Sequence, residues 1–409
     1  MGAVREGGHS TSKGWTLAEH IFPTYHYMPS SIRSVPRLSS LLVSDSSRYR
    51  YITVSTPHRG KKVFEPSALG MSSSIPQHTD GSTKWASQDG QFRRQVSSFR
   101  GFIEPQGKHP PALGRYKLFV ALACPWAHRT LLLRKLKGID KVDNLLPVYV
   151  VDSLLGPEGW SFEPYERTYP ELKGLGVPGT GLVPGHEDKK RIKGFYLASD
   201  PKYSARCTVP VIWDEELQTV VSNESSEIIR NLNSCFDEFI PVEYCGLTFY
   251  PQALHSDIDA INEWIYHDIN NGVYKSGFAT TQEAFEYSVV PLFKSLDRIE
   301  SILAKNGGGE KSDTYLVGKQ LTEADIRLFT TIVRFDPVYF THFKCNAALI
   351  RSDRFKNIHA WLKRLYWLHP GFKETTSFES IKAHYYQSHP QNNPNRIVPL
   401  GPEPHIEPL

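Results

Sequence analysis

The sequence has 409 residues and a formal net charge of +4 at pH 7. A chain of this length can bury a large hydrophobic core and corresponds to two or three domains. Residues 1–70 hold nine Lys/Arg against four Asp/Glu, which leaves 38 against 39 for residues 71–409. The body of the chain is therefore close to neutral, which argues against a nucleic-acid partner.

The cysteines and the hydropathy pattern indicate the cellular compartment of the protein and argue against several classes of site. Five cysteines, Cys124, Cys207, Cys235, Cys245 and Cys345, are scattered without paired spacing. This argues for a reducing compartment and against both a disulfide framework and a zinc site, and the sixteen histidines show no metal spacing. No uninterrupted apolar run approaches the ~20 residues that span a bilayer, so we expect a soluble, cytoplasmic protein with no membrane partner.

The N-terminal segment, residues 1–74, carries no sustained hydrophobic periodicity. Between residues 28 and 62 it contains seven Lys/Arg, many serines and a single acid, Asp45. Transit peptides have this basic, Ser-rich composition, and an unstructured tail has the same appearance. We expect either a disordered tail or a mitochondrial transit segment, with Met71 as an alternative start of a shorter form.

The most informative stretch is residues 116–137, YKLFVALACPWAHRTLLLRKLK. An apolar run predicts a strand, and the Leu-rich segment that opens at Pro125 has helical spacing, so a strand leads directly into a helix. Cys124 stands at this junction, where unpaired N–H groups and the helix dipole favour thiolate over thiol. His128 and Arg129, one turn further on, are expected to add positive charge that lowers the thiol pKa.

Cys124 is therefore the candidate nucleophile. Ala127 stands where a Cys-x-x-Cys motif has its second thiol, so chemistry at Cys124 must pass through a mixed disulfide with an outside thiol. A small buried cysteine that fills the end of a strand is the alternative interpretation. The combination of strand, Cys-Pro and helix favours the nucleophile.

The next segments predict the rest of an α/β domain. Residues 144–151 predict a second strand, parallel to the first because a helix joins them. A long Gly/Pro-rich insertion follows at residues 152–204. Residues 208–221 predict a β-hairpin, in which Pro210 is unusual because proline gives no donor to the ladder.

The segment SNESSEIIRNL then begins a helix at Ser222 to Glu224. A helix start with free N–H groups suits a carboxylate ligand, and simple N-capping by Ser222 or Asn223 is the alternative. From about residue 253 the pattern is helical throughout, with predicted helices at residues 254–270, 282–305, 322–334, 354–368 and 377–386. Thr322 and Asp325 have the spacing of a capping box.

Six segments of the chain together resemble one known family. They are ALACPWAHRT around Cys124, GWSF at Gly159 to Phe162, ARCTVPVIWD from Ala205, VSNESSEIIR from Val221, NNGVYKSGFA from Asn270 and RFDPVYFTHFKC from Arg334. They resemble the glutathionyl-hydroquinone reductases, also called Xi-class glutathione transferases, which are Omega-like. The similarity covers roughly residues 75 to 402, and so many motifs in order are not a product of chance.

The resemblance implies an α/β plus all-α fold. A thioredoxin-like N-terminal domain at residues 110–240, with the insertion 152–204, is followed by a glutathione-transferase-type helical domain at residues 250–385, with the ligand cleft between them. The family also implies an N-terminal arm at residues 75–115 and a homodimer formed through the helical domain. Residues 386–409, which are rich in proline, are expected to form an extended C-terminal tail.

The resemblance also assigns residues to glutathione, namely Trp160, Arg206, Val209, Pro210, Glu224 and Ser225. Pro210 would be a cis proline facing Cys124, and the backbone of Val209 would hold the glutathione peptide. Ser225 and nearby N–H groups would take the γ-glutamyl carboxylate, while Glu224 would pair with the ammonium. Trp160 could instead pack the insertion onto the domain. This packing role and a role in binding glutathione are compatible.

Four tyrosines of the helical domain are candidates for the aromatic part of the site. Tyr266 and Tyr339 are candidate catalytic acids, and Tyr274 and Tyr366 are candidate substrate-binding rings. Each of them alone is more often a packing residue than a site residue.

The reaction that the resemblance implies is the reduction of a glutathionyl-hydroquinone to the hydroquinone. The Cys124 thiolate attacks the glutathione sulfur, the hydroquinone carbon leaves with a proton, and a second glutathione resolves the mixed disulfide and gives oxidised glutathione. Glutathione is then a co-substrate, aromatic glutathionyl conjugates are the expected partners, and no metal is required. An Omega-like thiol transferase or dehydroascorbate reductase, and a non-catalytic glutathione-binding module, remain as alternatives.

Overall fold

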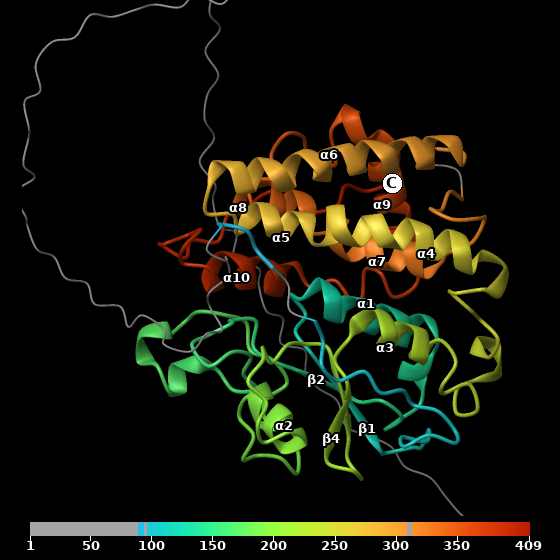
Figure 1. Cartoon of the computed structure of the whole chain (residues 1–409), viewed down its shortest axis with the longest axis vertical. Helices are drawn as coiled ribbons and strands as arrows, with labels where there is room; N and C mark the ends of the chain where they lie inside the picture. Colours follow the sequence, from blue (N-terminus) through green and yellow to red (C-terminus); the bar gives the residue numbers. More distant parts are fainter. Residues whose placement is uncertain (1–88, 94–95, 309–312) are drawn as a thin grey trace, which may run out of the picture. The chain divides into compact units, whose positions relative to one another are not determined.

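The computed structural model describes residues 89–93, 96–308 and 313–409. The tail or transit segment at residues 1–74, Met71 and the first part of the arm lie outside the described residues. The chain from Ser73 onward forms one compact unit. Within its described part, a sheet-containing domain and a helical domain lie one above the other (Figure 1).

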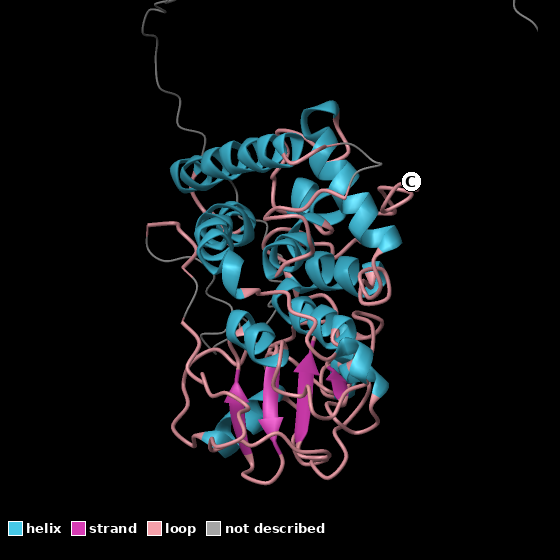
Figure 2. Cartoon of the chain, turned by 90° about the vertical axis from the view of Figure 1, so that its right-hand side faces the viewer, coloured by secondary structure: helices cyan, strands magenta, loops and turns pink. Residues whose placement is uncertain are grey.

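The first domain is built on a four-stranded mixed sheet, which Figure 2 shows below the helical domain. Its order is β2-β1-β3-β4, with bounds β1 Tyr116–Val120, β2 Val148–Val150, β3 Val211–Asp214 and β4 Thr219–Ser222. Strand β2 runs parallel to β1, whereas β3 is antiparallel to both β1 and β4. The predicted parallel pair and the predicted hairpin are confirmed, and the sheet has the thioredoxin-like form expected.

Three helices complete this domain: α1 Pro125–Leu136, α2 Ile192–Ser199 and α3 Ser225–Leu232. Helices α1 and α3 contact each other, and α1 also contacts α7 (Glu323–Ile332) of the helical domain. Helix α2 lies inside the insertion and contacts β4. Its Phe195 packs on Phe119 and Trp213, at ring-centroid distances of 4.5 and 5.0 Å, because these side chains all point to the α2 side of the sheet.

The helical domain follows from residue 255. Its elements are α4 His255–Trp264, α5 Gly272–Gly277, α6 Gln282–Lys305, α7, α8 Phe340–His342, α9 Lys356–Leu368 and α10 Phe378–Ser388, with π-helical turns η7 Ile265–Asn270 and η8 Phe335–Tyr339. Short 3-10 turns are η2 Ile139–Lys141, η3 Tyr165–Arg167, η4 Pro170–Leu172, η5 Val242–Tyr244, η6 Gln252–Leu254 and η9 Asp353–Phe355. The prediction for 282–305 is confirmed to the residue, whereas the predicted helix 254–270 changes to a π-turn after Trp264.

The capping box at the start of α7 is confirmed. Thr322 and Asp325 exchange side-chain and backbone hydrogen bonds, and the other carboxylate oxygen of Asp325 accepts from Leu316 N and Trp361 Nε1, both at 3.0 Å. Burial raises the pKa of Asp325 to about 6, against the opposing effect of these hydrogen bonds. The role of this motif is structural, as expected.

An ion network joins α3 to the helical domain. The buried carboxylate of Glu323 accepts from Arg230 Nη2 at 2.8 Å and from Asn262 Nδ2 at 3.0 Å. Arg230 also pairs with Asp259 on α4, and its guanidinium lies 4.1 Å from the ring centroid of Tyr250. These contacts hold α3 close to the helical domain.

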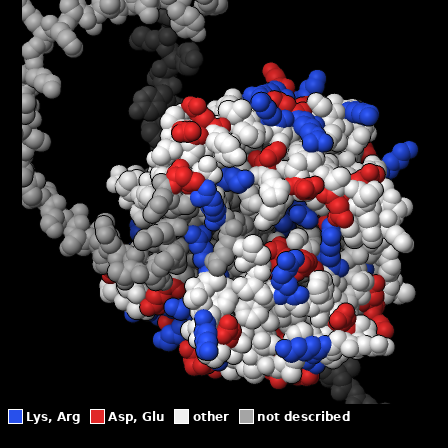
Figure 3. Space-filling view, viewed as in Figure 1, with Lys and Arg blue, Asp and Glu red and all other residues white. Residues whose placement is uncertain are grey.

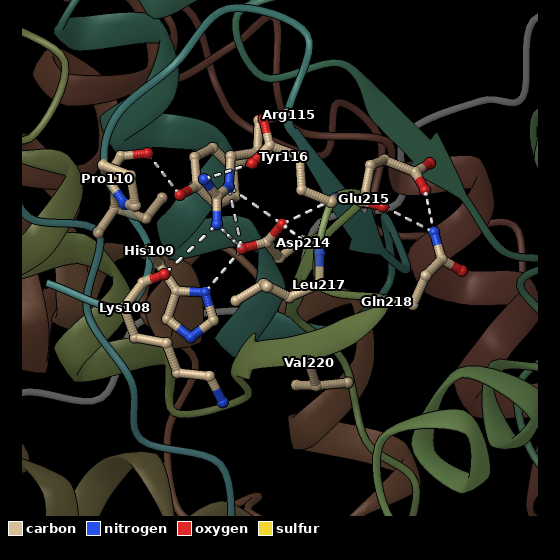
Figure 4. Close-up of polar contacts among 12 residues, drawn as sticks. Lys108, His109, Pro110, Arg115, Tyr116, Asp214, Glu215, Leu217, Gln218 and Val220 are labelled. Atoms are coloured by element: carbon tan, nitrogen blue, oxygen red, sulfur yellow. Dashed lines mark hydrogen bonds and ion pairs between the residues drawn. The ribbon is translucent and has the colours of Figure 1, made fainter.

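The described part of the arm begins beside the helical domain, where Phe92 packs on Tyr274 and Phe278, and then runs over the first domain and ends on β3 (Figure 1). Ile103 N donates to Asn231 Oδ1 on α3 at 2.8 Å. Figure 4 shows the end of this path, where the buried Asp214 carboxylate accepts from His109 Nδ1 and from Arg115 Nη2, both at 2.7 Å. The arm is thus fixed to the sheet by a buried charged cluster.

The C-terminal tail returns along the helical domain. Trp367 Nε1 donates to Glu407 O at 2.9 Å, and Arg351 Nη2 donates to His405 O at 2.9 Å. None of the described helices is both long and apolar enough to cross a membrane. On the face drawn in Figure 3, basic and acidic side chains are interspersed.

Candidate active site

A cavity of about 430 Å³ lies where the arm, the first domain and the helical domain meet. Its lining includes Phe92, Val96 and Ser97 of the arm, Cys124, Trp126, Trp160, Arg206, Cys207, Val209 and Asn223 of the first domain, and Asn271, Tyr274, Phe278, His384 and His389 of the helical domain. Aromatic side chains are frequent in this lining, so the cavity suits a flat apolar ligand with a few polar anchors.

Cys124 lies where the sequence predicted, between β1 and α1. It is the N-cap residue of α1, Pro125 follows as the first helical residue, and the first turn of α1 contains no acidic side chain. Its Sγ lies 3.5 Å from the carbonyl oxygen of Val209, and the expected cis peptide bond joins Val209 to Pro210. The thiol thus faces the cavity from a helix N-terminus, an environment that favours a thiolate.

The expectation that His128 adds positive charge near Cys124 is wrong. The imidazole is fully buried, its Nδ1 accepts from Arg334 Nη1 at 3.0 Å, and its Nε2 contacts Thr375 Oγ1 at 2.9 Å. Burial, reinforced by the charge of Arg334, lowers the pKa of His128 well below its usual range, so the ring is neutral at neutral pH.

Arg129, the other residue expected to add charge, does lie beside the site. Its guanidinium is 4.5 Å from the ring centroid of Trp126, and its Nη2 donates to Asn270 Oδ1 at 2.9 Å. Its Nη1 lies 3.4 Å from Ser225 Oγ at the start of α3. Arg129 therefore connects the helix of Cys124 to the residue expected to hold the glutathione carboxylate.

The start of α3 differs in detail from the sequence interpretation. Neither Ser222 nor Asn223 is the N-cap, because Glu224 takes that position and accepts from Ser226 N at 3.1 Å. The second carboxylate oxygen of Glu224 accepts from Ser97 Oγ of the arm at 2.9 Å. This contact with the arm has no local sequence signal, since the two partners are 127 residues apart in sequence.

The other residues expected to bind glutathione divide into two groups. Trp160, Arg206 and Val209 line the cavity, while Pro210, Glu224 and Ser225 are not part of its lining. Burial lowers the pKa of Arg206. Sequence reasoning missed Cys207, a second thiol in the lining, and His384, on which Trp160 stacks.

Three tyrosine hydroxyls form a chain that begins at the cavity. Tyr274, which lines the cavity, is hydrogen-bonded through its hydroxyl to Tyr385, and the Tyr385 oxygen lies 3.0 Å from that of Tyr339. Burial raises the pKa of all three phenols, that of Tyr339 to about 12, and the negative charge of a Cys124 thiolate acts on Tyr274 and Tyr339 in the same direction. The phenols are therefore protonated at neutral pH. Sequence reasoning missed Tyr385.

Three of the tyrosine candidates lie outside the cavity lining: Tyr339, which is fully buried and reaches Tyr274 through Tyr385, and Tyr266 and Tyr366. Tyr266 contacts Trp126 edge to face, with ring centroids 5.8 Å apart. Tyr366 packs on Trp367 and Phe378 near the end of α9, with centroids 4.9 and 6.2 Å away. Neither Tyr366 nor Tyr266 borders the cavity, although Tyr266 contacts Trp126, which does; their roles in the site stay predictions. Among the described residues, no group of three or more His, Cys, Asp or Glu is arranged to hold a metal ion.

Residues 123–235 match the model of the glutathione S-transferase N-terminal domain, and residues 282–364 that of the C-terminal domain. Over 327 residues the chain is 49% identical to "Glutathione S-transferase omega-like 2" of Schizosaccharomyces pombe, covering 80% of this chain and 97% of that protein. It is 44% identical over 332 residues to "Glutathionyl-hydroquinone reductase YqjG" of Escherichia coli, covering 78% and 93%. The solved structure of the Xi-class glutathione transferase of Phanerochaete chrysosporium is 49% identical, with a TM-score of 0.72, covering 79% of this chain and 96% of that one. The chain belongs to the Xi-class glutathione transferase family.

A solved member of the same class agrees in fold. The Xi glutathione transferase ECM4 of Saccharomyces cerevisiae, crystallised with glutathione, has a TM-score of 0.71 and 46% identity, covering 77% of this chain and all of that one, 100%. The thioredoxin-like domain followed by a helical domain is therefore confirmed for this Xi-class chain. The chain therefore belongs to the glutathione transferase superfamily of enzymes, and solved relatives with bound glutathione support glutathione binding.

Proposed function

We propose that this protein reduces glutathionyl-hydroquinones with glutathione as the co-substrate. The observation that carries the proposal is that one cavity wall holds two reactive groups, a thiol and a phenol hydroxyl. Cys124 presents a thiol at a helix N-terminus, and Tyr274 presents the first hydroxyl of a buried phenol chain. A thiolate attacks sulfur, and a phenol gives a proton to the group that leaves.

The glutathione part of the substrate would lie along the first domain. Its peptide would pair with the backbone of Val209, next to the Cys124 sulfur. Its γ-glutamyl carboxylate would bind at the start of α3 near Ser225 and Arg129, where N–H groups and a guanidinium favour an anion. Its ammonium would replace Ser97 as a partner of Glu224.

The aromatic part would lie among the rings of the cavity. Tyr274 is stacked with Phe92 and with Trp126, at centroid distances of 6.2 and 6.5 Å. A hydroquinone ring that lies against such faces gains offset-stacking contacts. One of its hydroxyls or the leaving carbon would then meet the hydroxyl of Tyr274.

The reaction uses two glutathione groups, one from the substrate and one from free glutathione. The Cys124 thiolate forms a disulfide with the glutathione sulfur as the carbon–sulfur bond breaks, and the ring carbon keeps the electron pair and takes a proton. A second glutathione thiolate attacks this mixed disulfide, which releases oxidised glutathione and restores Cys124. The phenol chain supplies the proton for the first step and regains it from solvent.

The test is turnover of glutathionyl-menadiol with glutathione, with the product identified, in the wild type, in Cys124→Ala and in a matched Cys245→Ala variant. Cys245 is exposed and outside the cavity lining, so its variant should behave as the wild type. Cys124→Ala should lose turnover and still bind glutathione. A substantial rate in Cys124→Ala would refute the mechanism. Turnover of a small disulfide but not of the aromatic thioether would instead favour an Omega-like thiol transferase or dehydroascorbate reductase.

A further inference from the structure

Arg334 is a fully buried arginine of the helical domain that contacts the first domain at the two residues before Cys124. It follows α7, and its exposed fraction is 0%. Its Nε donates to Ala123 O at 2.9 Å and its Nη2 to Leu122 O at 3.0 Å. These are the carbonyl groups of the two residues that precede Cys124, so the guanidinium fixes the loop that presents the thiol.

The same residue also reaches the tyrosine chain. The carbonyl oxygen of Arg334 accepts from Tyr339 N at 3.2 Å and so closes the π-turn η8. Its charge lowers the pKa of Tyr339, against the larger effect of burial, and acts on Tyr274 and Tyr385 in the same direction. Arg334 thus contacts the elements that carry the nucleophile and the proton donors.

The partners of the guanidinium are all uncharged. Besides the two carbonyls of the loop, it donates to Thr330 O at 2.7 Å and to the neutral imidazole of His128. No Asp or Glu in the described part of the chain forms an ion pair with it. A buried charge is costly unless an opposite charge compensates it, and an arginine cannot lose its proton. The native state therefore holds a cation that gains stability when an anion forms nearby.

The other titratable groups around Arg334 do not supply that anion at neutral pH. On α1, His128 is neutral and Arg129 is a second cation, and on α10 burial lowers the pKa of His384 to about 4. On the helical domain the phenols Tyr274, Tyr339 and Tyr385 stay protonated. The group beside the loop that can become negative is the thiol of Cys124.

We propose that Arg334 is a positioning residue for Cys124 and the internal counter-charge of its thiolate. The guanidinium holds the Leu122 and Ala123 carbonyls in place and stabilises negative charge on the sulfur one residue further on. The same charge would then stabilise the phenolate that remains on the tyrosine chain after it has given its proton to the ring carbon. This inference rests on the proposed role of Cys124 as nucleophile.

The test is the pH dependence of Cys124 alkylation by iodoacetamide, with modification of the Cys124 peptide quantified by mass spectrometry. This measurement needs no turnover and separates Cys124 from the other thiols. In the wild type the midpoint should lie below the ordinary thiol value of ~8.5. Arg334→Gln should raise it by about one unit or more, the range expected when a nearby opposite charge is lost, and so slow alkylation roughly tenfold at pH values below the midpoint.

Two further variants separate charge from position and from folding. Arg364→Gln is the matched control, because Arg364 is also a buried arginine that donates to a backbone carbonyl, Thr314 O at 2.8 Å, away from the cavity lining. It should leave the midpoint unchanged. Arg334→Lys keeps the charge and loses the planar fork, so its midpoint should move little while kcat falls about tenfold or more.

If Arg334→Gln folds and the midpoint of Cys124 alkylation is unchanged, Arg334 is not the counter-charge of the thiolate. If Arg334→Gln does not fold, a wild-type alkylation midpoint at the ordinary thiol value would overturn the same role. A wild-type kcat in Arg334→Lys would overturn the positioning role. If Cys124→Ala keeps its activity while the midpoint still shifts in Arg334→Gln, the proposed reaction fails and only the effect of the Arg334 charge on the Cys124 thiol stands.

Discussion

The indole ring of Trp160 stacks on the imidazole of His384, with ring centroids 5.0 Å apart and planes 28° from parallel. One ring belongs to the insertion of the first domain and the other to α10, and both line the cavity. His384 is itself fixed by a hydrogen bond between its Nδ1 and Ser153 O of 2.9 Å. The pair therefore ties the insertion to the helical domain at the edge of the cavity.

We expect His384→Ala to raise KM for glutathionyl conjugates more than it lowers kcat. Removal of the imidazole frees Trp160, and aromatic pairs contribute about 0.5–1.5 kcal/mol, which corresponds to a rise in KM of up to about tenfold. Steady-state kinetics on one conjugate would measure this. His384→Phe should restore most of the loss by keeping the stack, and His369→Ala, outside the cavity lining, should have no effect.

The tyrosine chain predicts an ordered series of defects. Tyr274→Phe should lower kcat on hydroquinone conjugates by roughly 10², since a positioned acid contributes at least about that much. Tyr385→Phe and Tyr339→Phe should cost less, because these hydroxyls act through Tyr274. Disulfide substrates, whose leaving thiolate needs less help, should be affected little.

Tyr266→Phe provides the control for this series, since Tyr266 is an aromatic neighbour of Trp126 outside the cavity lining. Its kcat should match the wild type. Equal losses on conjugates and on disulfides in the Tyr274 variant would show that the hydroxyl has a packing role and does not donate a proton.

The cluster around Asp214 predicts how stability depends on pH. Burial opposes ionisation of Asp214, but hydrogen bonds from Arg115 and His109 outweigh it, so the pKa is lower than usual. A carboxyl with a lowered pKa stabilises the native state above its unfolded pKa of about 3.9, and this contribution is lost as the pH falls through the native pKa. Urea unfolding of Asp214→Asn should show a loss of the order of 3 kcal/mol at pH 7, because Arg115 loses a buried partner.

The same difference should shrink in acid, where the wild-type carboxyl takes up its proton. Glu216→Gln is the control, because Glu216 also pairs with Arg115 but its side chain is 61% exposed. Exposed ion pairs contribute about 1 kcal/mol or less. A difference between wild type and Asp214→Asn that grows toward acid would contradict this account.

The N-terminal composition predicts a targeting experiment. If residues 28–70 are a transit segment, a fusion of residues 1–75 to a fluorescent reporter should enter mitochondria. Neutral residues at Arg33, Arg37, Arg48 and Arg50 should return the fusion to the cytosol, while deletion of residues 28–70 should leave activity unchanged. A native fusion that stays diffuse in the cytosol would identify the segment as a tail without a targeting role.

Local patterns were sufficient for much of the fold. The strand–Cys–Pro–helix junction, α6 and the capping box at Thr322 depend on residues close in sequence, so periodicity and caps predicted them. The tyrosines were harder, because Tyr266 lies within the π-turn η7 and Tyr339 ends η8. A π-turn adds a residue and rotates the next side chains by about 100° around the helix axis, so α-helical spacing assigns them to the wrong face.

Long-range contacts explain the remaining differences. The charge state of His128 is set by burial and by Arg334, which is 206 residues away in sequence. Tyr385 joins Tyr274 and Tyr339 only because α10 packs against η8 and α5 comes close to both. No local pattern carries such information, since the neighbours are defined by the assembled helical domain.

The contacts of the arm determine what truncation or proteolysis would remove from the cavity. Phe92, Val96 and Ser97 belong to the cavity wall, and Thr280 N donates to Gly90 O at 3.2 Å just before α6. A fragment that begins at the first strand would keep every sheet and helix residue of the enzyme and still lose one side of its substrate chamber. A nick between Gly90 and Phe99 would therefore separate part of the cavity wall from the chain and, on the proposed function, change which glutathionyl conjugates bind, whereas a polypeptide initiated at Met71 would carry the whole wall.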